Sequence, residues 1–123
     1  MNGLRTLVIG ASPNPDRYSY KAVMKLIEHG HEPIGIGVKE GQIGSLTILK
    51  GMPRIEGVNT VTLYIGPERQ PEYYDYIIGL KPKRLIMNPG TENPEFARMA
   101  EKSGIEVVEA CTLVLLATGQ YEY

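Results

Sequence analysis

Apolar and polar positions along this 123-residue chain follow two alternating periods, one typical of buried strands and one typical of amphipathic helices. Short apolar runs predict five strands, at 4–9, 32–38, 60–65, 84–87 and 105–108. Helical spacing in the segments between them predicts helices at 19–29, 69–80, 94–103 and 112–117. Residues 40–59 contain four glycines and one proline, and they predict only a weak strand at 46–49.

Helix start and stop signals support these boundaries. Ser19 is expected to cap the first helix, because its hydroxyl can accept a hydrogen bond from the free amides of the first turn. Asn93, followed by Pro94 at the first helical position, is expected to cap the third helix. Gly30 and Gly104 stand where a helix commonly ends in a left-handed glycine.

Strands that alternate with helices indicate one α/β domain over residues 1–123, with a mainly parallel sheet of about five strands between two layers of helices. In such sheets, ligands bind at the carboxyl ends of the strands, near the point where the strand order reverses. The turns predicted at that edge are 10–17, 37–39, 66–67, 88–91 and 109–111.

The first of these turns has the features of a phosphate cradle with one glycine in place of three. Gly10 allows a tight turn, and Ala11 and Ser12 are small enough for a phosphate to approach the main chain. The positive end of the first helix would hold the phosphate, with Arg17 and Ser19 adding charge and a hydroxyl. An ordinary loop stiffened by prolines is the alternative interpretation.

The next two turns bear on the choice of ligand. Lys39 follows the second strand, where a cation suits a phosphorylated ribose, as in NADP or the 3′-phosphoadenosine of coenzyme A (CoA). Glu40 keeps NAD open, and an exposed surface lysine is the plain alternative for Lys39. Residues 65–67 (Ile-Gly-Pro) form a flat rim suited to adenine or a pantetheine arm, although Gly-Pro also commonly ends strands.

Composition and charge exclude several classes of function. The net charge of −1 provides no basic surplus for nucleic acid or an anionic membrane surface. The basic cluster at 81–84 is interpreted as a solvated helix end. A single cysteine, Cys111, permits no internal disulfide, which favours a cytoplasmic location. No leader is recognised, and no apolar run approaches the ~18 residues of a membrane span.

Few residues are candidates for catalysis or metal binding. His29 and His31 lie at the edge opposite the ligand, as a helix-end cation and a surface residue. Cys111 stands at a helix start that could lower its pKa, but a buried structural cysteine is favoured. Three carboxylates without an acid/base partner are assigned to helix first turns and solvent: Glu92, Glu95 and Glu109. We therefore predict no catalytic residue and no metal site.

Several stretches, taken in order, resemble a known family. They are VIGAS (8–12), RYSYKAV (17–23), LIEHGHEPIGIG (26–37), MPRIEGVNTVTLYIGPE (52–68), MNPGTEN (87–93) and AEKSGIEVVEACTLVLLATGQY (100–121). Over nearly the whole chain they are similar to small stand-alone CoA-binding domain proteins, relatives of the nucleotide-binding domain of the succinyl-CoA synthetase α subunit. The resemblance implies a Rossmann-like fold with CoA lying across the strand ends.

Carried over by position, the family's binding regions fall on Gly10, Ala11, Ser12 and Pro13, on Lys39, and on Ile65, Gly66 and Pro67. Asn88 and Gly90, in the turn after the fourth strand, complete the predicted cofactor-binding residues together with Arg17 and Ser19. Many relatives have Val-Asn-Pro at Gly37–Val38 and a Trp and Gln at Met87–Asn88, which alters the pocket floor. The synthetases' phosphohistidine domain has no counterpart here, so their catalysis is not transferred.

Three hypotheses follow for the function. The first is a binding protein for CoA or an acyl-CoA, a small nucleotide-type ligand, without catalysis of its own. The second is an NADP-binding, oxidoreductase-like protein, which would need a substrate pocket beyond this single domain. The third is a regulatory or structural Rossmann-like protein that has lost its ligand and acts through a homodimer or an unknown protein partner.

Overall fold

A computed structural model describes residues 3–122 and contains a five-stranded, fully parallel sheet. The strands lie in the order β2-β1-β5-β6-β7. Their bounds are β1 Arg5–Ile9, β2 Glu32–Ile36, β5 Thr60–Leu63, β6 Arg84–Met87 and β7 Glu106–Glu109. These strands confirm the α/β class, and the predicted segments differ from them by no more than two residues at either end.

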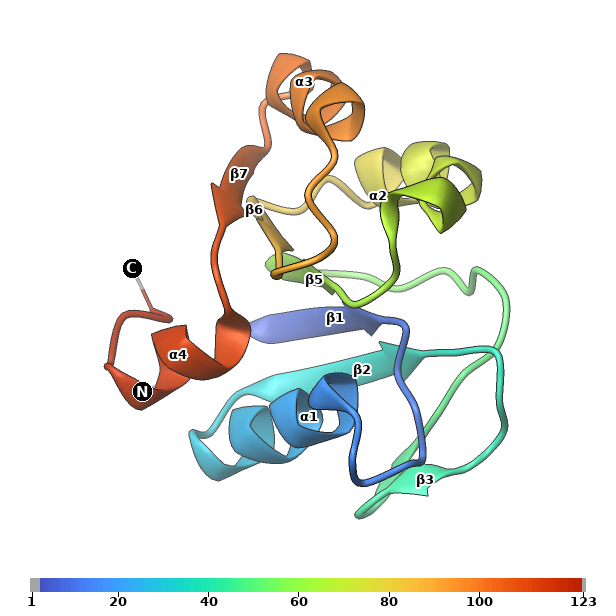
Figure 1. Ribbon diagram of the computed structural model, residues 1–123, viewed down its shortest axis with the longest axis vertical. Helices are drawn as coiled ribbons and strands as arrows, with labels where there is room; N and C mark the ends of the chain where they lie inside the picture. Colours follow the sequence, from blue (N-terminus) through green and yellow to red (C-terminus); the bar gives the residue numbers. More distant parts are fainter. Residues whose placement is uncertain (1–2, 123) are drawn as a thin grey trace.

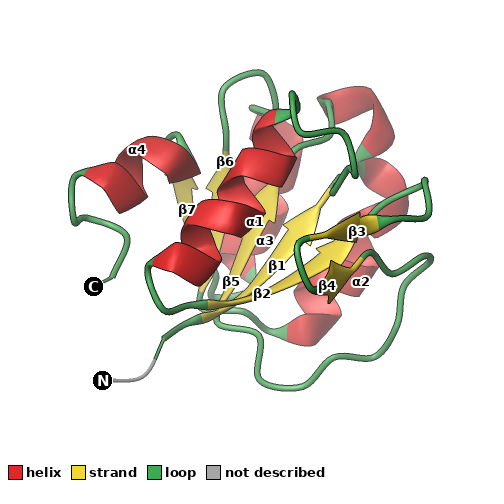
Figure 2. Ribbon diagram, turned by 90° about the horizontal axis from the view of Figure 1, so that it is seen from below, coloured by secondary structure: helices red, strands yellow, loops and turns green. Residues whose placement is uncertain are grey.

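Helices cover both faces of the sheet (Figures 1 and 2). The helices α1 (Tyr18–Glu28) and α4 (Thr112–Ala117) pack on one face, and α2 (Tyr74–Leu80) and α3 (Pro94–Lys102) pack on the other. Successive strand residues point to opposite faces, so Val8 joins the α1/α4 core while Leu7 and Ile9 join the α2/α3 core. Because both faces are covered, every residue of β1 from Thr6 to Ile9 is buried.

The segment predicted as one weak strand contains a hairpin and an isolated bridge. The strands β3 (Gln42–Ile43) and β4 (Leu46–Thr47) pair antiparallel around a turn at Gly44. Leu49 then pairs parallel with β2: its amide donates to the carbonyl of Gly35 at 2.8 Å, and its carbonyl accepts from the amide of Gly37 at 2.9 Å. The chain thus adds a rudimentary strand outside β2 before it crosses to β5.

The predicted helix at 69–80 is broken into three pieces. Two 3₁₀ turns, Pro67–Arg69 and Pro71–Tyr73, precede α2. Each turn begins with a proline, whose nitrogen cannot donate to the preceding carbonyls of an α-helical ladder. The helix proper therefore begins only at Tyr74, after the second proline.

Helix ends confirm three of the predicted signals and correct one. Asn93 caps α3, since its Oδ1 accepts from the amide of Phe96 at 3.1 Å. Gly30 and Gly104 follow the ends of α1 and α3 with φ of +82° and +85°. Ser19 is not a cap: Arg17 occupies the cap position of α1, and Ser19 is buried within the first turn.

Two side chains expected at the surface are buried at the amino edge of the sheet. His31 is only 8% exposed, and its Nδ1 accepts from the amide of Leu4 at 2.9 Å. The guanidinium of Arg84 lies 4.4 Å from the ring centre of Tyr121 and donates to the Tyr121 carbonyl at 2.8 Å. The interpretations of His31 as a surface residue and of Arg84 as part of a solvated cluster were therefore wrong.

Tyr121 holds this buried cluster together. Its ring meets the His31 ring edge-on with centres 4.8 Å apart, and its hydroxyl pairs with that of Thr6 at 2.5 Å. Burial lowers the pKa of His31, and the nearby charges of His29 and Arg84 act in the same direction against the opposing carboxylate of Glu122. Tyr121 is thus packed against the start of β1, far from the carboxyl edge.

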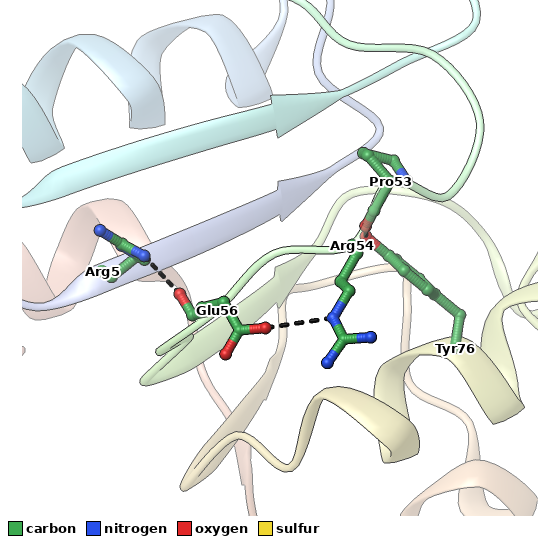
Figure 3. Close-up of polar contacts among 5 residues, drawn as sticks. All are labelled: Arg5, Pro53, Arg54, Glu56 and Tyr76. Carbon is green, nitrogen blue, oxygen red and sulfur yellow. Dashed lines mark hydrogen bonds and ion pairs between the residues drawn. The ribbon is translucent and has the colours of Figure 1, made fainter.

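Residues 50–59 cross from the rudimentary strand to β5 without regular structure (Figure 3). The Tyr76 hydroxyl of α2 donates to the carbonyl of Pro53 at 2.6 Å, and the Arg5 guanidinium of β1 donates to the carbonyl of Glu56. Arg54 pairs with the Glu56 carboxylate at 3.1 Å. These contacts fasten the crossing segment to α2 and β1.

Candidate functional site

The order of the strands places the expected ligand site between β1 and β5. From β1 the chain adds β2 and Leu49 outward on one side, and from β5 it adds β6 and β7 outward on the other. At such a reversal the turns that follow the two central strands diverge and leave a crevice. A cavity of about 730 Å³ opens there, within the range of small-molecule and cofactor sites.

The cavity brings together ten of the twelve residues that the sequence predicts for ligand binding. They are Gly10, Ala11, Ser12, Pro13, Arg17, Ser19, Lys39, Ile65, Gly66 and Gly90. Four separate turns, following β1, β2, β5 and β6, contribute them. Their contact with a ligand stays a prediction, but their convergence on one crevice follows from the parallel sheet.

The structure does not bring Pro67 and Asn88 into the cavity lining. Pro67 begins a 3₁₀ turn whose last residue, Arg69, lines the cavity although Pro67 does not. Asn88 is 2% exposed, and its amide nitrogen donates to the hydroxyl of Thr62 at 2.6 Å and to the carbonyl of Leu63 at 2.7 Å. Its Oδ1 accepts from the amide of Thr112 at 2.8 Å. Asn88 therefore ties β5, β6 and α4 together beneath the site.

The turn after β1 uses its glycine for close packing. The amides of Gly10 and Ala11 both donate to the carbonyl of Ile36 at 2.9 Å, so they are already engaged. Gly10 has φ +95°, and a Cβ there would lie 2.9 Å from Ile65 and 3.0 Å from the backbone of Tyr64. The glycine thus allows the turns after β1 and β5 to approach each other.

The rest of this loop positions the start of α1. The hydroxyl oxygen of Ser12 accepts from the amide of Asn14 at 3.1 Å, and the side-chain oxygen of Asn14 accepts from the amide of Asp16 at 2.9 Å. Arg17, at the cap position, and the first-turn residue Ser19 both line the cavity. The first amides of a helix have no partner within it and carry its positive dipole end, so this part of the wall attracts anions.

Charged side chains add to this positive character. The cations Arg17, Lys39 and Arg69 line the cavity, against one carboxylate, that of Asp16. None of these four takes part in the ion pairs found within residues 3–122. In a chain with a net charge of −1, this local excess favours a ligand with several negative charges.

Gln70 connects the two turns that follow β5 and β6. It is fully buried, and its amide nitrogen donates to the carbonyl of Ile65 at 3.0 Å and to that of Thr91 at 2.8 Å. Its side-chain oxygen accepts from the amide nitrogen of Asn93 at 3.0 Å, and that nitrogen also reaches the Tyr74 hydroxyl at 2.9 Å. The turns after β5 and β6 are thereby held together as one rigid rim.

About half of the lining was not assigned individually as ligand-binding, although six of these residues lie in the turns predicted at the ligand edge. The residues not assigned are Asn14, Asp16, Tyr18, Ile36, Gly37, Val38, Tyr64, Arg69, Tyr73, Pro89 and Thr91. Most are neighbours of assigned residues, which is the signal that could have found them. Arg69 and Tyr73 carried no such signal, because they were interpreted as part of a continuous helix.

Tyr64 contributes a neutral phenol to the lining. Burial raises the pKa of Tyr64, and the nearby hydroxyls of Thr112 and Thr62 oppose this only in part. The phenol therefore stays protonated at physiological pH. Its hydroxyl oxygen is buried, so Tyr64 adds an aromatic surface to the lining and no charge.

The cysteine considered as a candidate reactive residue does not line the cavity. Cys111, expected to be buried, is half-buried at the start of α4. Within residues 3–122, no group of three or more His, Cys, Asp or Glu side chains is placed to hold a metal ion. In the same part of the chain, each helix is too short or too polar to cross a membrane.

The strand order and the single-glycine turn after β1 are those of a doubly wound, Rossmann-like α/β protein, and its crevice is lined by an excess of cations. The chain belongs to the CoA binding domain family, whose family model matches residues 5–117. This match confirms the resemblance stated from the sequence.

Solved structures agree with this fold. A crystal structure of an uncharacterized protein has 49% sequence identity and a TM-score of 0.94, covering 98% of this chain and 99% of that chain. A protein of Thermus thermophilus has 19% identity and a TM-score of 0.84, covering 96% of this chain and 90% of that one. A hypothetical protein from Pyrococcus horikoshii OT3 has 22% identity and a TM-score of 0.80, with coverages of 89% and 78%. The last two support the fold alone.

Among proteins with curated descriptions, no relative matches the chain significantly.

Proposed function

We propose that this protein binds coenzyme A or an acyl-CoA in the cavity between the turns after β1 and β5. The observation that carries the proposal is the set of three cations, Arg17, Lys39 and Arg69, that line one cavity in a chain of the CoA binding domain family. CoA carries a pyrophosphate and a ribose 3′-phosphate, so its adenosine half is strongly anionic. A positively charged crevice suits that half.

Each part of the ligand has a counterpart in the lining. The pyrophosphate lies against the start of α1, near Arg17 and Ser19. The ribose 3′-phosphate lies at Lys39, beyond the end of β2. The pantetheine arm runs along the apolar rim at Ile65 and Gly66 toward Gly90. The proposal assigns binding alone to these residues and no chemical step.

Isothermal titration calorimetry of the purified chain with CoA, acetyl-CoA and NADPH tests the proposal. CoA and acetyl-CoA are expected to bind. In a thermal unfolding experiment, each ligand at about 100 times its dissociation constant should add about 2.7 kcal/mol to the free energy of unfolding. Binding of NADPH with no response to CoA would favour the NADP hypothesis. No binding of any nucleotide would favour a protein that acts through a homodimer or another partner.

Lys39→Ala tests the assignment of the ribose phosphate. An exposed charge pair contributes on the order of 1 kcal/mol, so the variant is expected to bind CoA about fivefold more weakly. Affinity for 3′-dephospho-CoA, which lacks the partner group, should not change. Lys83→Ala is the matched control, because Lys83 is also exposed but precedes β6 at the opposite edge. Equal losses for both ligands would remove Lys39 from the 3′-phosphate site.

A further inference from the structure

Two exposed apolar side chains line the cavity. They are Tyr18, which is 68% exposed, and Val38, which is 66% exposed. The other exposed large hydrophobic side chains within residues 3–122 lie between 37% and 55%. Apolar surface left in water is unfavourable, and a concentration of it beside a polar site is typical of a surface that a ligand covers.

The surroundings of these two side chains limit what the ligand part can be. Val38 directly precedes Lys39, and Tyr18 lies between Arg17 and Ser19. Each of the two apolar side chains is therefore adjacent in sequence to a group assigned to a phosphate. A flat apolar ring joined to a phosphorylated sugar fits this pattern, and in CoA that ring is the adenine base.

The positions of both side chains are set by the backbone. Tyr18 is the first residue of α1 and follows the loop that Ser12 and Asn14 shape. Val38 follows Gly37, whose α-carbon packs so closely on the β1 turn that a Cβ there would lie 2.1 Å from the carbonyl oxygen of Ala11. The amide of Gly37 is also bound to the carbonyl of Leu49 at 2.9 Å. The backbone at Tyr18 and at Val38 is thus held in place before a ligand binds.

One face of the Tyr18 ring is already occupied. The ammonium nitrogen of Lys21 lies over this ring, 5.4 Å from its centre. A cation in this position holds the ring in one orientation and leaves the opposite face to the solvent or to a ligand.

We propose that Tyr18 and Val38 form a clamp that holds the adenine base of the bound CoA, with Tyr18 stacked on the base. This inference rests on the proposed function, and it names the residues that select an adenine nucleotide over the isolated pantetheine arm. Stacking on an aromatic side chain suits any base, so discrimination among nucleotides falls to the phosphate contacts.

Truncation of the ring tests the clamp. Tyr18→Ala is expected to weaken CoA binding about tenfold, the size of one base–aromatic stacking contact, whereas Tyr18→Phe keeps the wild-type affinity. Affinity for 4′-phosphopantetheine, which has no adenine, should be the same in all three proteins. Ile27→Ala is the control, since Ile27 is an exposed apolar residue of the same helix outside the cavity lining.

A tryptophan at residue 18 reports the contact directly. The chain contains no tryptophan, so Tyr18→Trp carries a single indole. Its fluorescence is expected to be quenched by CoA and by adenosine 3′,5′-bisphosphate, and to be unaffected by 4′-phosphopantetheine. Quenching by all three ligands, or by none while CoA binds, would overturn the clamp.

The two proposals fail in different ways. If the wild-type chain binds no CoA, the proposed function is wrong and the clamp falls with it. If the wild-type chain and Tyr18→Ala bind CoA with equal affinity, the function stands and the clamp alone is wrong.

Discussion

Asn88 provides a quantitative test of whether the turn after β6 is a ligand contact or an internal brace. In Asn88→Ala, three hydrogen bonds disappear, those to Thr62, Leu63 and Thr112. The Thr62 hydroxyl keeps its partner, the Thr112 hydroxyl at 2.8 Å. The Leu63 carbonyl and the Thr112 amide lose their Asn88 partner in a buried region, at about 1–3 kcal/mol for each such group. The free energy of unfolding should fall by about 3 kcal/mol, within the summed range of about 2–6 kcal/mol for the two groups.

Urea unfolding followed by circular dichroism measures this loss. With a slope of about 2 kcal/mol per molar urea, the midpoint should move down by about 1.5 M. The control is Asn14→Ala, because Asn14 is exposed and its side chain makes one local hydrogen bond, so its midpoint should move little.

Affinity for CoA separates the two roles of Asn88. Since Asn88 does not line the cavity, the dissociation constant of folded Asn88→Ala should stay within about twofold of wild type. An unchanged unfolding midpoint together with a tenfold loss of affinity would refute the reasoning and restore Asn88 as a ligand residue.

Two further predictions concern the close backbone contact at Gly37 and the buried histidine. Gly37→Ala places a Cβ against the Ala11 carbonyl, so we expect a loss of about 2 kcal/mol in thermal unfolding, while Gly79→Ala, which meets no atom within 4 Å, should lose none. The pKa of His31 is lowered by burial below its ordinary value of 6.5, so protons bind the unfolded chain more readily. The free energy of unfolding should therefore reach its full value above pH 6.5 and should fall as the pH drops below 6.5. His31→Gln should remove this slope from the unfolding free energies measured at each pH, and His29→Gln should keep it.

The parallel sheet was predictable because its signals are local. Buried parallel strands are short apolar runs, and β6 and α4 are found at the bounds that their composition predicts. Asn93 and Pro94 likewise predict the start of α3, because the Asn93 cap bonds an amide only three residues later in the sequence. Once the strands are known to be parallel, their carboxyl ends must share one edge, so most of the cavity lining follows from the topology.

Roles that depend on distant partners were not predictable in this way. Arg84 resembles its basic neighbours in sequence, but Tyr121, 37 residues later, supplies the carbonyl and the ring that allow its burial. His31 is buried because the same tyrosine covers it. Asn88 follows a strand, as a ligand residue would, yet its Oδ1 partner is the amide of Thr112. In each case a polar side chain is buried by a contact that local sequence does not encode.

The single glycine of the first turn has a structural explanation. In a three-glycine fingerprint, the second glycine lets the pyrophosphate approach the backbone. Here the amides of Gly10 and Ala11 both bind the carbonyl of Ile36, so this part of the turn serves the sheet. The proposed site therefore assigns the anion to the first turn of α1 and to the side chains of Arg17 and Lys39. A loop that recognises phosphate through a helix end and charged side chains has no need of the second glycine, and Ser12 can instead shape the approach to α1.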